Sequence, residues 1–378
     1  MSEAFFEADM DTVLDISYKN NGCYQVAVEE DYSRLGRLLS ERFPGLKRIC
    51  IVSDSNVSKL YLDNVISAVS PCADAVTSFV FEAGEGSKTL DTVNACYDKL
   101  LADDHNRRDL IIGLGGGVTG DVAAFIASTY MRGCRFVNLP TSLLAMADSS
   151  VGGKCGVDYD KYKNLVGSIY MPSLVYAATD TLSTLPVREF SSGMGEILKA
   201  GLIRDADFYD WQITNNTGIM ERDAAILQEM IIRAVAIKQY YVTVDPFESG
   251  ERMILNLGHT IGHALEKYYD FRYLHGECVA LGTVAAAYIS YKRSMLSSEK
   301  FDMIRDSFIP FGLPVSLDSF DTDVVYANIG HDKKNTDSGL KFILLEDIGK
   351  AVIVNDVTDD EIKDAIGHLI AGRDSHEQ

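Results

Sequence analysis

Two histidines stand four residues apart in the apolar segment LNLGHTIGHALE. At this spacing His259 and His263 lie on one face of a helix, where they could bind one metal ion. If residues 251–269 form a single helix, Arg252 and Asn256 lie on the same polar stripe. A buried polar stripe costs free energy unless it meets partners, which a metal ion and a substrate would supply. The alternative is a pair of hydrogen-bonded core histidines, so both, one or neither could be ligands.

Further metal donors occur in two other apolar helical patterns. Glu196 is followed by Lys199 in SSGMGEILKAG, and His275 precedes the long apolar run of YLHGECVALG. A carboxylate in such a helix usually needs a cation. Glu196, His259 and His275 form a Glu/His/His set that suits zinc with coordination positions open to substrate. Lys238, in VAIKQYYVTVD, would add positive charge.

The glycine-rich segment GLGGGVTGD contains G-x-G-x-x-G at Gly115, Gly117 and Gly120. It follows a predicted strand and opens a predicted helix, a context that favours pyrophosphate binding over a merely tight turn. The usual fingerprint adds an acidic residue about 20 positions later, but the next predicted strand, RFVNLPTS, has none. Asp54, at the end of the strand RICIVSD, is a candidate for a ribose contact instead.

Residues 147–167, ADSSVGGKCGVDYDKYKNLVG, have little hydrophobic periodicity and are predicted to form a loop. Lys154 and Lys163 in this segment could bind phosphate or carboxylate groups. A solvated loop with incidental lysines is the alternative, and the segment by itself favours it.

The first half of the chain alternates strand and helix patterns. This alternation predicts an α/β domain with a parallel, Rossmann-like sheet and helices on both faces. After residue 185 the patterns are mainly helical. We place the boundary near 183–189, giving domains 1–185 and 186–378. The active site is expected in the cleft between them, near the carboxyl ends of the strands.

The composition excludes several classes of protein. The 378 residues carry a net charge of −20, which argues against binding nucleic acid or an anionic membrane surface. No run reaches the roughly 18 apolar residues that span a membrane. The acidic start lacks a secretory pattern, and the seven cysteines contain no CxxC. We therefore expect reduced thiols and a cytoplasmic protein.

Several segments together resemble the 3-dehydroquinate synthase family of the sugar-phosphate cyclase superfamily. They occur in order over most of the chain, which is far more specific than one glycine loop. The matching segments are GEGSK (84–88), GGGVTGD (115–121), STYMRG (128–133), LPTSLLAMADSSVGGK (139–154), YKNLVG (162–167), TLSTLPVRE (181–189), GEILKAGLI (195–203), LNLGHTIGHALE (255–266), LHGECVALG (274–282) and HDKKN (331–335).

The resemblance implies a lyase of the shikimate pathway, which leads to the aromatic amino acids. Such an enzyme converts 3-deoxy-D-arabino-heptulosonate 7-phosphate (DAHP) into 3-dehydroquinate and phosphate. The reaction proceeds by transient oxidation with NAD, phosphate elimination, reduction, ring opening and intramolecular aldol closure. NAD is regenerated in each turnover, and a divalent metal, foremost zinc with cobalt as an alternative, is required. Domain 1–185 would bind NAD, domain 186–378 would bind metal and substrate, and two chains would form a homodimer.

The resemblance also implies roles for individual residues. The metal ligands are Glu196, His259 and His275. His263 faces the substrate or lies behind the ligands. The catalytic set is Lys154, Lys199, Lys238, Arg252, Asn256, His263, Asp148 and Asn164. Substrate binding falls to Arg132, which reaches the neighbouring subunit's substrate, and to Lys163 and one of Lys333 and Lys334. The NAD contacts are Asp54, Glu85, Lys88, Gly115, Gly116, Gly117, Val118, Asp121, Thr141, Ser142 and Thr184.

Some positions depart from the family's commoner residues, among them Cys155, Asp158 and Pro246. They leave open a related cyclase that makes an inosose or a valiolone from another sugar phosphate. The segment DSSVGGK, Arg252 and the late lysines favour a substrate with a carboxylate. A metal- and NAD-dependent polyol dehydrogenase, which would release NADH, and a non-enzymatic binding protein are the remaining alternatives.

Overall fold

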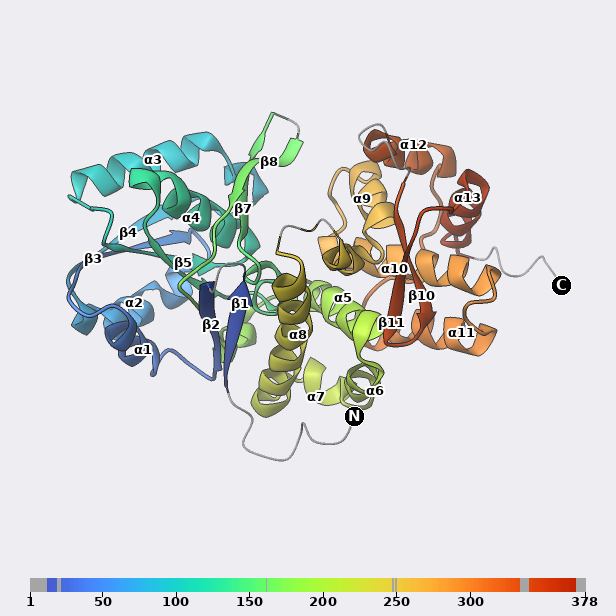
Figure 1. Cartoon of the computed structure of the whole chain (residues 1–378), viewed down its shortest axis with the longest axis horizontal. Coiled ribbons are helices and arrows are strands. Elements are labelled where there is room, and N and C mark those ends of the chain that lie inside the picture. Colours follow the sequence, from blue (N-terminus) through green and yellow to red (C-terminus); the bar gives the residue numbers. More distant parts are fainter. Residues whose placement is uncertain are drawn as a thin grey trace. The chain divides into compact units, whose positions relative to one another are not determined.

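The computed structural model describes residues 12–18, 22–160, 162–246, 248, 250–333 and 340–371 (Figure 1). Internal contacts divide the chain into two compact units. The first is Met1–Leu185 together with Ala224–Gln239, and the second is Pro186–Asp223 together with Tyr240–Gln378. Most of helix α8 (Ala224–Val244) thus belongs to the first unit. The division therefore differs from the predicted one, which has a single boundary at residue 185. The roles assigned to the domains remain predictions.

The first unit is built on a seven-stranded sheet. Its strand order is β1-β2-β9-β6-β5-β3-β4, and all neighbours are parallel except β1 and β2, which are antiparallel. The predicted parallel sheet is therefore confirmed, although β1, β2 and β9 were not anticipated. The strands are β1 (Val13–Tyr18), β2 (Gly22–Glu29), β3 (Leu46–Asp54), β4 (Ala73–Phe81), β5 (Leu110–Gly115), β6 (Arg135–Pro140) and β9 (Leu174–Ala178).

Helices cover both faces of this sheet, as the alternating pattern predicted. Successive side chains of a strand point to opposite faces. Ile49 and Ile51 of β3 accordingly belong to one core cluster. Cys50 and Val52 belong to the other. Helices α1 (Leu35–Arg42) and α2 (Ser58–Val69) pack on the first cluster, and α3 (Leu90–Ala102) and α4 (Gly117–Thr129) pack on the second (Figure 1).

The loop predicted for residues 147–167 is wrong. Strands β7 (Lys154–Tyr159) and β8 (Tyr162–Ile169) form an antiparallel hairpin there. Three consecutive residues of β7 are buried, because this strand packs against α4, whereas β8 is almost entirely exposed. Neither strand has the alternation of a half-buried strand, which is why the pattern escaped detection.

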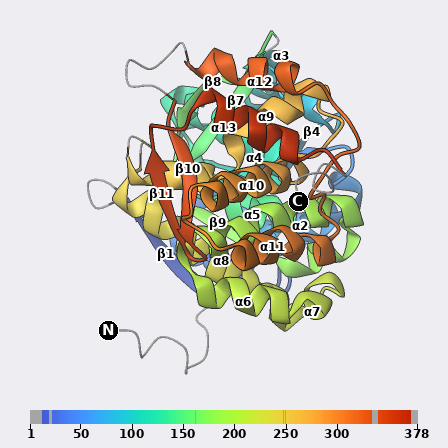
Figure 2. The same ribbon diagram turned by 90° about the vertical axis from the view of Figure 1, so that its right-hand side faces the viewer.

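The second unit is mainly helical, as predicted, with one unpredicted two-stranded sheet of β10 (Phe342–Asp347) and β11 (Lys350–Val354). Helix α10 (His275–Lys292) is buried along most of its length and contacts α5, α9, α11, α13 and β10 (Figure 2). No helix among the described residues is both long and apolar enough to cross a membrane. The other helices are α5 (Val187–Arg204), α6 (Ala206–Thr214), α7 (Asn216–Met220), α9 (His259–Tyr268), α11 (Ser298–Ser307), α12 (Thr322–Lys333) and α13 (Asp359–His368).

The single helix predicted for residues 251–269 is also wrong. A 3₁₀ segment covers Glu251–Asn256, the chain then leaves helical geometry, and α9 begins only at His259. Gly258 makes the break with φ of +80°, where a Cβ atom would lie 2.6 Å from Oγ1 of Thr283. Only glycine combines this conformation with so close an approach. Since the chain leaves helical geometry at Gly258, Arg252 and Asn256 do not share one helical stripe with His259 and His263.

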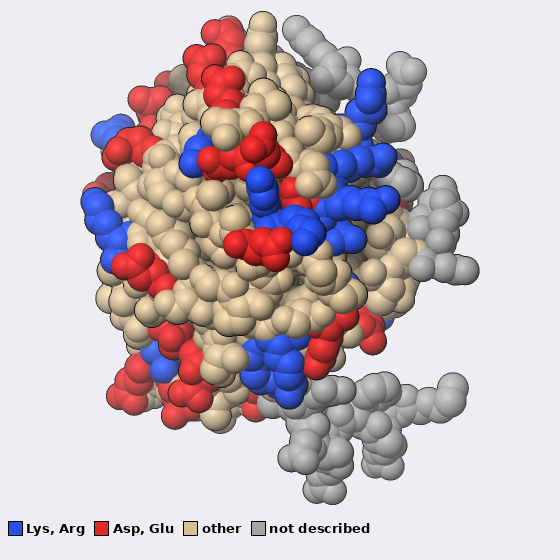
Figure 3. Space-filling view, turned by 90° about the vertical axis from the view of Figure 1, so that its left-hand side faces the viewer, with Lys and Arg blue, Asp and Glu red and all other residues tan. Residues whose placement is uncertain are grey.

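Charge is unevenly distributed over the surface. Figure 3 shows Lys and Arg side chains gathered on one face, with Asp and Glu side chains beside them. A net charge of −20 therefore leaves room for local positive regions. Such regions are what a small anionic substrate would need.

Candidate active site

Helices α5 and α10 approach closely enough to place Glu196 beside His275. The approach is made at Gly276, where a Cβ atom would lie 1.7 Å from the carbonyl oxygen of Ser192. The amide of Gly276 donates to Oγ of the same serine at 3.0 Å. A side chain at residue 276 would push the helices apart, so this glycine brings the two predicted ligands together.

A second close approach brings His259 to the same place. At Gly282 of α10 a Cβ atom would lie 1.9 Å from the carbonyl oxygen of Gly258, just before α9 begins. His259 and His275 are the first residues of their helices, and their ring centroids are 5.2 Å apart. The two helices therefore present their first residues to one point.

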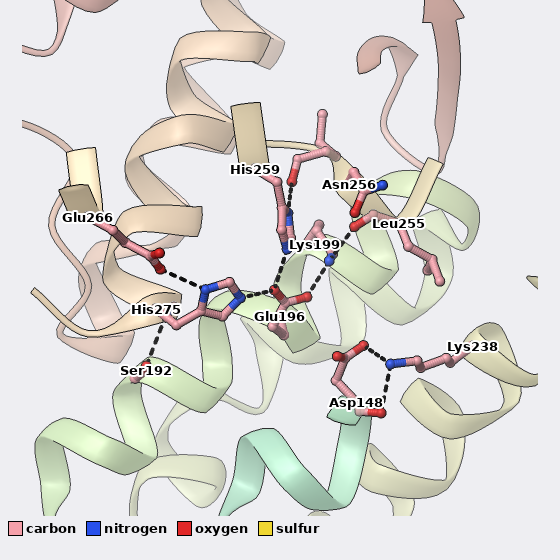
Figure 4. A network of polar contacts seen from close by, with 12 residues as sticks. Asp148, Ser192, Glu196, Lys199, Lys238, Leu255, Asn256, His259, Glu266 and His275 are labelled. Carbon is pink, nitrogen blue, oxygen red and sulfur yellow. Dashed lines mark hydrogen bonds and ion pairs between the residues drawn. The ribbon is translucent and has the colours of Figure 1, made fainter. Parts of the chain in front are cut away.

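Three predicted ligands converge there (Figure 4). Nε2 of His259 lies 3.4 Å, and Nε2 of His275 3.2 Å, from Oε1 of Glu196. The other ring nitrogen of each histidine is also engaged: Nδ1 of His259 lies 3.1 Å from the carbonyl oxygen of Leu257, and Nδ1 of His275 lies 2.8 Å from Oε1 of Glu266. Two imidazole nitrogens and one carboxylate oxygen within 4.8 Å of one another fit a divalent transition metal.

Lys199 gives the buried carboxylate a positive neighbour. Its ammonium group forms an ion pair with Glu196 and donates to the carbonyl oxygen of Leu255 at 2.5 Å. Burial alone would raise the pKa of Glu196, but Lys199 and the two histidines hold it well below its usual value. Burial and Lys199 lower the pKa of His259 well below its usual value, so its Nε2 offers a free lone pair to a metal.

His275 has the opposite protonation behaviour. Burial would lower its pKa, but hydrogen bonds with Glu196 and Glu266 outweigh burial and raise the pKa to about 10. Without a metal, His275 therefore carries a proton that an incoming metal ion has to displace.

His263 lies next to this group but outside it. Its ring centroid is 5.2 Å from that of His259 and 6.0 Å from that of His275, and its side chain is exposed. Together with Glu266 and His275 it forms a second group of possible metal ligands. The two histidines of LNLGHTIGHALE thus fall into different groups.

Arg252 and Asn256 lie in the 3₁₀ segment before α9. Arg252 is buried, and its Nη1 donates to the carbonyl oxygen of Pro246 at 2.8 Å. Nδ2 of Asn256 donates to Oε1 of Glu248 at 2.8 Å. Glu248 was not singled out from the sequence, although a carboxylate four residues before Arg252, in the segment ESGER, was a signal that could have found it.

The glycine loop lies where the sequence predicted it, between β5 and α4. Gly116 precedes α4, and Gly117 is its first residue. A pocket beside the loop is lined by Gly116, Gly117, Asp121 and Lys154, among others. The backbone amides at the start of a helix favour an anion, so the loop can receive a phosphate group.

Lys88 joins the glycine loop to the hairpin. Its buried ammonium group lies 2.6 Å from Oδ2 of Asp121 and 2.5 Å from Oδ1 of Asn164. Burial raises the pKa of Asp121, and Lys88 opposes that rise. Two predicted NAD-contacting residues and one predicted catalytic residue therefore form one network.

Asp54 has protein partners for both carboxylate oxygens. Oδ1 accepts from the amides of Asn56 and Val57 at 2.9 and 3.0 Å, and Oδ2 accepts from Oγ1 of Thr119 at 2.9 Å. The residue caps the turn after β3 and ties it to α4. A ribose hydroxyl would have to share these hydrogen bonds.

Asp148 and Lys238 form another predicted pair that the structure brings together. Asp148 lies in a short π-helical segment, Ala145–Ser149, a feature frequent at functional sites. Nζ of Lys238 lies 2.6 Å from Oδ1 of Asp148 and 2.7 Å from its carbonyl oxygen (Figure 4). Both residues belong to the first unit, because Lys238 lies in the part of α8 that groups with the sheet.

The remaining predicted residues are dispersed over the first unit or lie at the end of α12. Glu85 and Lys163 are exposed, with Nζ of the lysine 3.9 Å from Oε1 of the glutamate; Lys154 is exposed at the start of β7, and Arg132 is exposed in a turn with φ of +64°. Val118 and Ser142 are half-buried near the glycine loop, where the amide of Thr141 donates to the carbonyl oxygen of Gly115 at 2.9 Å. Oγ1 of Thr184 lies 2.5 Å from the hydroxyl oxygen of Tyr61. Lys333 ends α12, and both its side chain and Lys334 lie outside the described residues.

Two family models match the central part of the chain, residues 78–335. Residues 78–192 match the family model described as 3-dehydroquinate synthase N-terminal, and residues 193–335 match the one described as 3-dehydroquinate synthase C-terminal. The chain belongs to the 3-dehydroquinate synthase family. The family predicted from the ordered motifs is thereby confirmed.

Relatives named 3-dehydroquinate synthase match almost the whole chain. The one from Ruminiclostridium cellulolyticum is 41% identical over 327 residues, which are 86% of this chain and 91% of that protein. The one from Acetivibrio thermocellus is 39% identical over 348 residues, which are 92% and 96% of the two chains.

Solved structures share the two-part fold. A 2-deoxy-scyllo-inosose synthase complexed with carbaglucose-6-phosphate, NAD+ and Co2+ has a TM-score of 0.85 at 28% identity, with 95% of this chain and 100% of that chain covered. The 2-epi-5-epi-valiolone synthase of Streptomyces hygroscopicus, with NAD+ and Zn2+ bound, has a TM-score of 0.85 at 27% identity, covering 94% and 98%. Glycerol dehydrogenase from Schizosaccharomyces pombe, at 18% identity and a TM-score of 0.66, shares the fold alone.

Proposed function

We propose that this chain is a 3-dehydroquinate synthase that converts DAHP into 3-dehydroquinate and phosphate with NAD and a divalent metal. Membership of the family and relatives of about 40% identity over most of the chain support this activity. The observation that carries the proposal is the convergence of Glu196, His259 and His275 on one point in the second unit.

Two groups of residues would hold the cofactors. Glu196, His259 and His275 would bind the metal, and the glycine loop at the start of α4 would bind NAD. When bound, these cofactors supply a Lewis acid that polarises the substrate's oxygen atoms and a reversible acceptor for the electrons of the carbinol. Structures of related cyclases with NAD+ and with Co2+ or Zn2+ support this assignment.

The chain's own residues would mainly position and neutralise an anion. Lys199 is buried next to the carboxylate ligand, and Lys238 is buried next to Asp148. Ammonium groups held in place favour the charge that develops as phosphate leaves. Arg252 is also buried and would meet a carboxylate, whereas Lys154, at the pocket beside the glycine loop, would meet a phosphate.

A related sugar-phosphate cyclase is the second candidate. The similarity to the inosose and valiolone synthases favours it, because both cover nearly all of this chain. Their identity of 27–28% is lower than the 39–41% of the relatives named 3-dehydroquinate synthase, which favours DAHP as substrate. The dehydrogenases are similar in fold only and carry no argument for that activity.

We further propose a cytoplasmic homodimer in which Arg132 reaches the substrate of the neighbouring subunit. The exposed position of Arg132, in a turn where Met131 and Arg132 both have positive φ, supports this role. Such a conformation costs free energy and is held at functional sites more often than elsewhere.

The test is phosphate release from DAHP by the metal-stripped protein and by the same protein after zinc is restored, each with NAD. We expect phosphate and 3-dehydroquinate in equal amounts, no net NADH, and activity only with metal. Glucose 6-phosphate serves as the comparison substrate. Phosphate release from glucose 6-phosphate alone, or net NADH formed from glycerol, would contradict the proposal.

A further inference from the structure

Behind the proposed metal site lies a carboxylate, Glu266, that contacts the proposed ligand His275. Glu266 is buried on α9, two turns after His259. Its Oε1 lies 2.8 Å from Nδ1 of His275, the ring nitrogen opposite the one that faces Glu196. Helix α9 therefore supplies both a proposed ligand, His259, and the carboxylate that contacts a second proposed ligand, His275.

Glu266 could in principle serve as a ligand itself, because it forms a second possible metal group with His263 and His275. Both groups contain His275, but they differ in the ring nitrogen that would face the ion. In the first group this is Nε2, next to Glu196. In the second it is Nδ1, next to Glu266.

Distances between the donor atoms separate these two possibilities. Two ligands at about 2.0–2.1 Å from a tetrahedral ion stand roughly 3.3 Å apart. The separations of 3.4 and 3.2 Å between Glu196 and the two histidines match this spacing. The 2.8 Å between Glu266 and Nδ1 of His275 is instead the length of a direct hydrogen bond, which leaves no room for an ion between the two atoms.

We propose that Glu266 is a positioning residue that accepts the Nδ1–H of His275 and so commits Nε2 of that ring to the metal. The inference rests on the proposed metal site formed by Glu196, His259 and His275. A carboxylate behind a ligating histidine fixes the tautomer and the orientation of the ring and makes it a stronger ligand. Glu266 thereby decides which of the two groups binds the ion.

The test measures zinc affinity, without substrate, by competition with a chromophoric chelator. Glu266→Ala should weaken zinc binding by about 10- to 100-fold. Glu266→Gln should lose much less, because its amide oxygen can still accept the Nδ1–H. His263→Asn should bind zinc as the wild type does. The matched control Glu189→Gln removes one exposed carboxylate from α5 of the same unit and should also have no effect.

Two results would overturn the inference. Wild-type affinity in Glu266→Ala would mean that the carboxylate does not support the ligand. A loss in Glu266→Gln as large as that in Glu196→Gln, together with a loss in His263→Asn, would make Glu266 a ligand. Circular dichroism of each variant checks folding, and the absorption spectrum of bound Co2+ reports the coordination geometry.

The outcome is separable from that of the proposed function. If the wild type binds zinc and the variants behave as expected, but DAHP releases no phosphate, the proposed activity fails and the positioning role stands. If the wild type binds no zinc, both fail. If DAHP is turned over and Glu266→Ala keeps full zinc affinity, only the positioning role fails.

Discussion

Lys199 and Glu196 form a buried ion pair in which each charge depends on the other, since both side chains are almost inaccessible to solvent. Removing Lys199 from the metal-free protein would leave protonated His275 as the remaining positive neighbour of the buried Glu196 carboxylate. The proposed metal is a second source of positive charge for the same carboxylate. The pair therefore offers a way to detect the metal through stability alone.

Lys199→Met should destabilise the metal-free protein by about 3 kcal/mol, the lower end for a broken buried pair, because protonated His275 stays beside Glu196. With zinc present the loss should be much smaller, because the ion compensates the charge of Glu196. Urea unfolding of wild type and variant, with and without zinc, measures both values. An equal loss in the two conditions would show that no cation binds at Glu196.

At the scale of elements, the break before α9 depends on Gly258. Gly258→Ala should cost well over the 1–2 kcal/mol of a left-handed residue, because its Cβ would also lie 2.7 Å from the carbonyl oxygen of Val279. Gly45→Ala is the matched control, since Gly45 has φ of +74° but no atom within 4 Å of a Cβ. Urea unfolding should separate the two variants, and equal losses would contradict the packing argument.

Besides its buried apolar residues, helix α13 has an ion pair between Glu361 and Arg293 that acid should break. Hydrogen bonds from Arg293, partly opposed by burial, and from Thr358 lower the pKa of Glu361 to about 2. A lowered pKa stabilises the folded state at neutral pH, and this contribution disappears as pH falls from about 4.5 to about 2. Both side chains are partly exposed, so we expect only about 1 kcal/mol.

The corresponding experiment compares Glu361→Gln with wild type at several pH values. The variant should be less stable at pH 7, and the difference should shrink steadily below pH 4.5. Asp323→Asn, which removes the exposed pair with Lys363, should leave the free energy of unfolding unchanged. A difference between Glu361→Gln and wild type that stays constant with pH would refute the assignment.

The elements that sequence patterns missed have physical reasons in common. The hydrophobic pattern of a segment reflects how that one element is buried. The alternating strands and helices around β3, β5 and α4 could therefore be predicted from the sequence. Hairpin β7–β8 was not readable, because one strand is buried over consecutive residues and the other is exposed. The break at Gly258 was hidden, because apolar residues continue on both sides of it.

For the whole molecule, the sequence contained the members of the candidate site but not the contacts that join them. Glu196, His259 and His275 could be named because a Glu/His/His set suits zinc. That Gly276 and Gly282 let the helices meet, and that most of α8 returns to the first unit, depends on partners far away in the sequence. Such partners leave no periodic signal.

A dimer with a shared site can be tested by complementation. Arg132→Ala and Glu196→Gln should each be nearly inactive alone. Mixed dimers would pair the intact metal site of one subunit with the intact arginine of the other, so refolding an equal mixture should restore about a quarter of wild-type activity. Recovery of no activity, with mixed dimers shown by mass spectrometry, would contradict the shared site.

Anomalous diffraction at the zinc edge, from crystals of the zinc-loaded protein, tests directly whether Glu196, His259 and His275 bind the metal. We expect one zinc ion bonded to Glu196 and to Nε2 of His259 and His275, each at about 2.0–2.2 Å. Glu266 should remain hydrogen-bonded to Nδ1 of His275, and His263 should not be bonded to the ion. Zinc bonded to His263 or Glu266 would contradict this assignment.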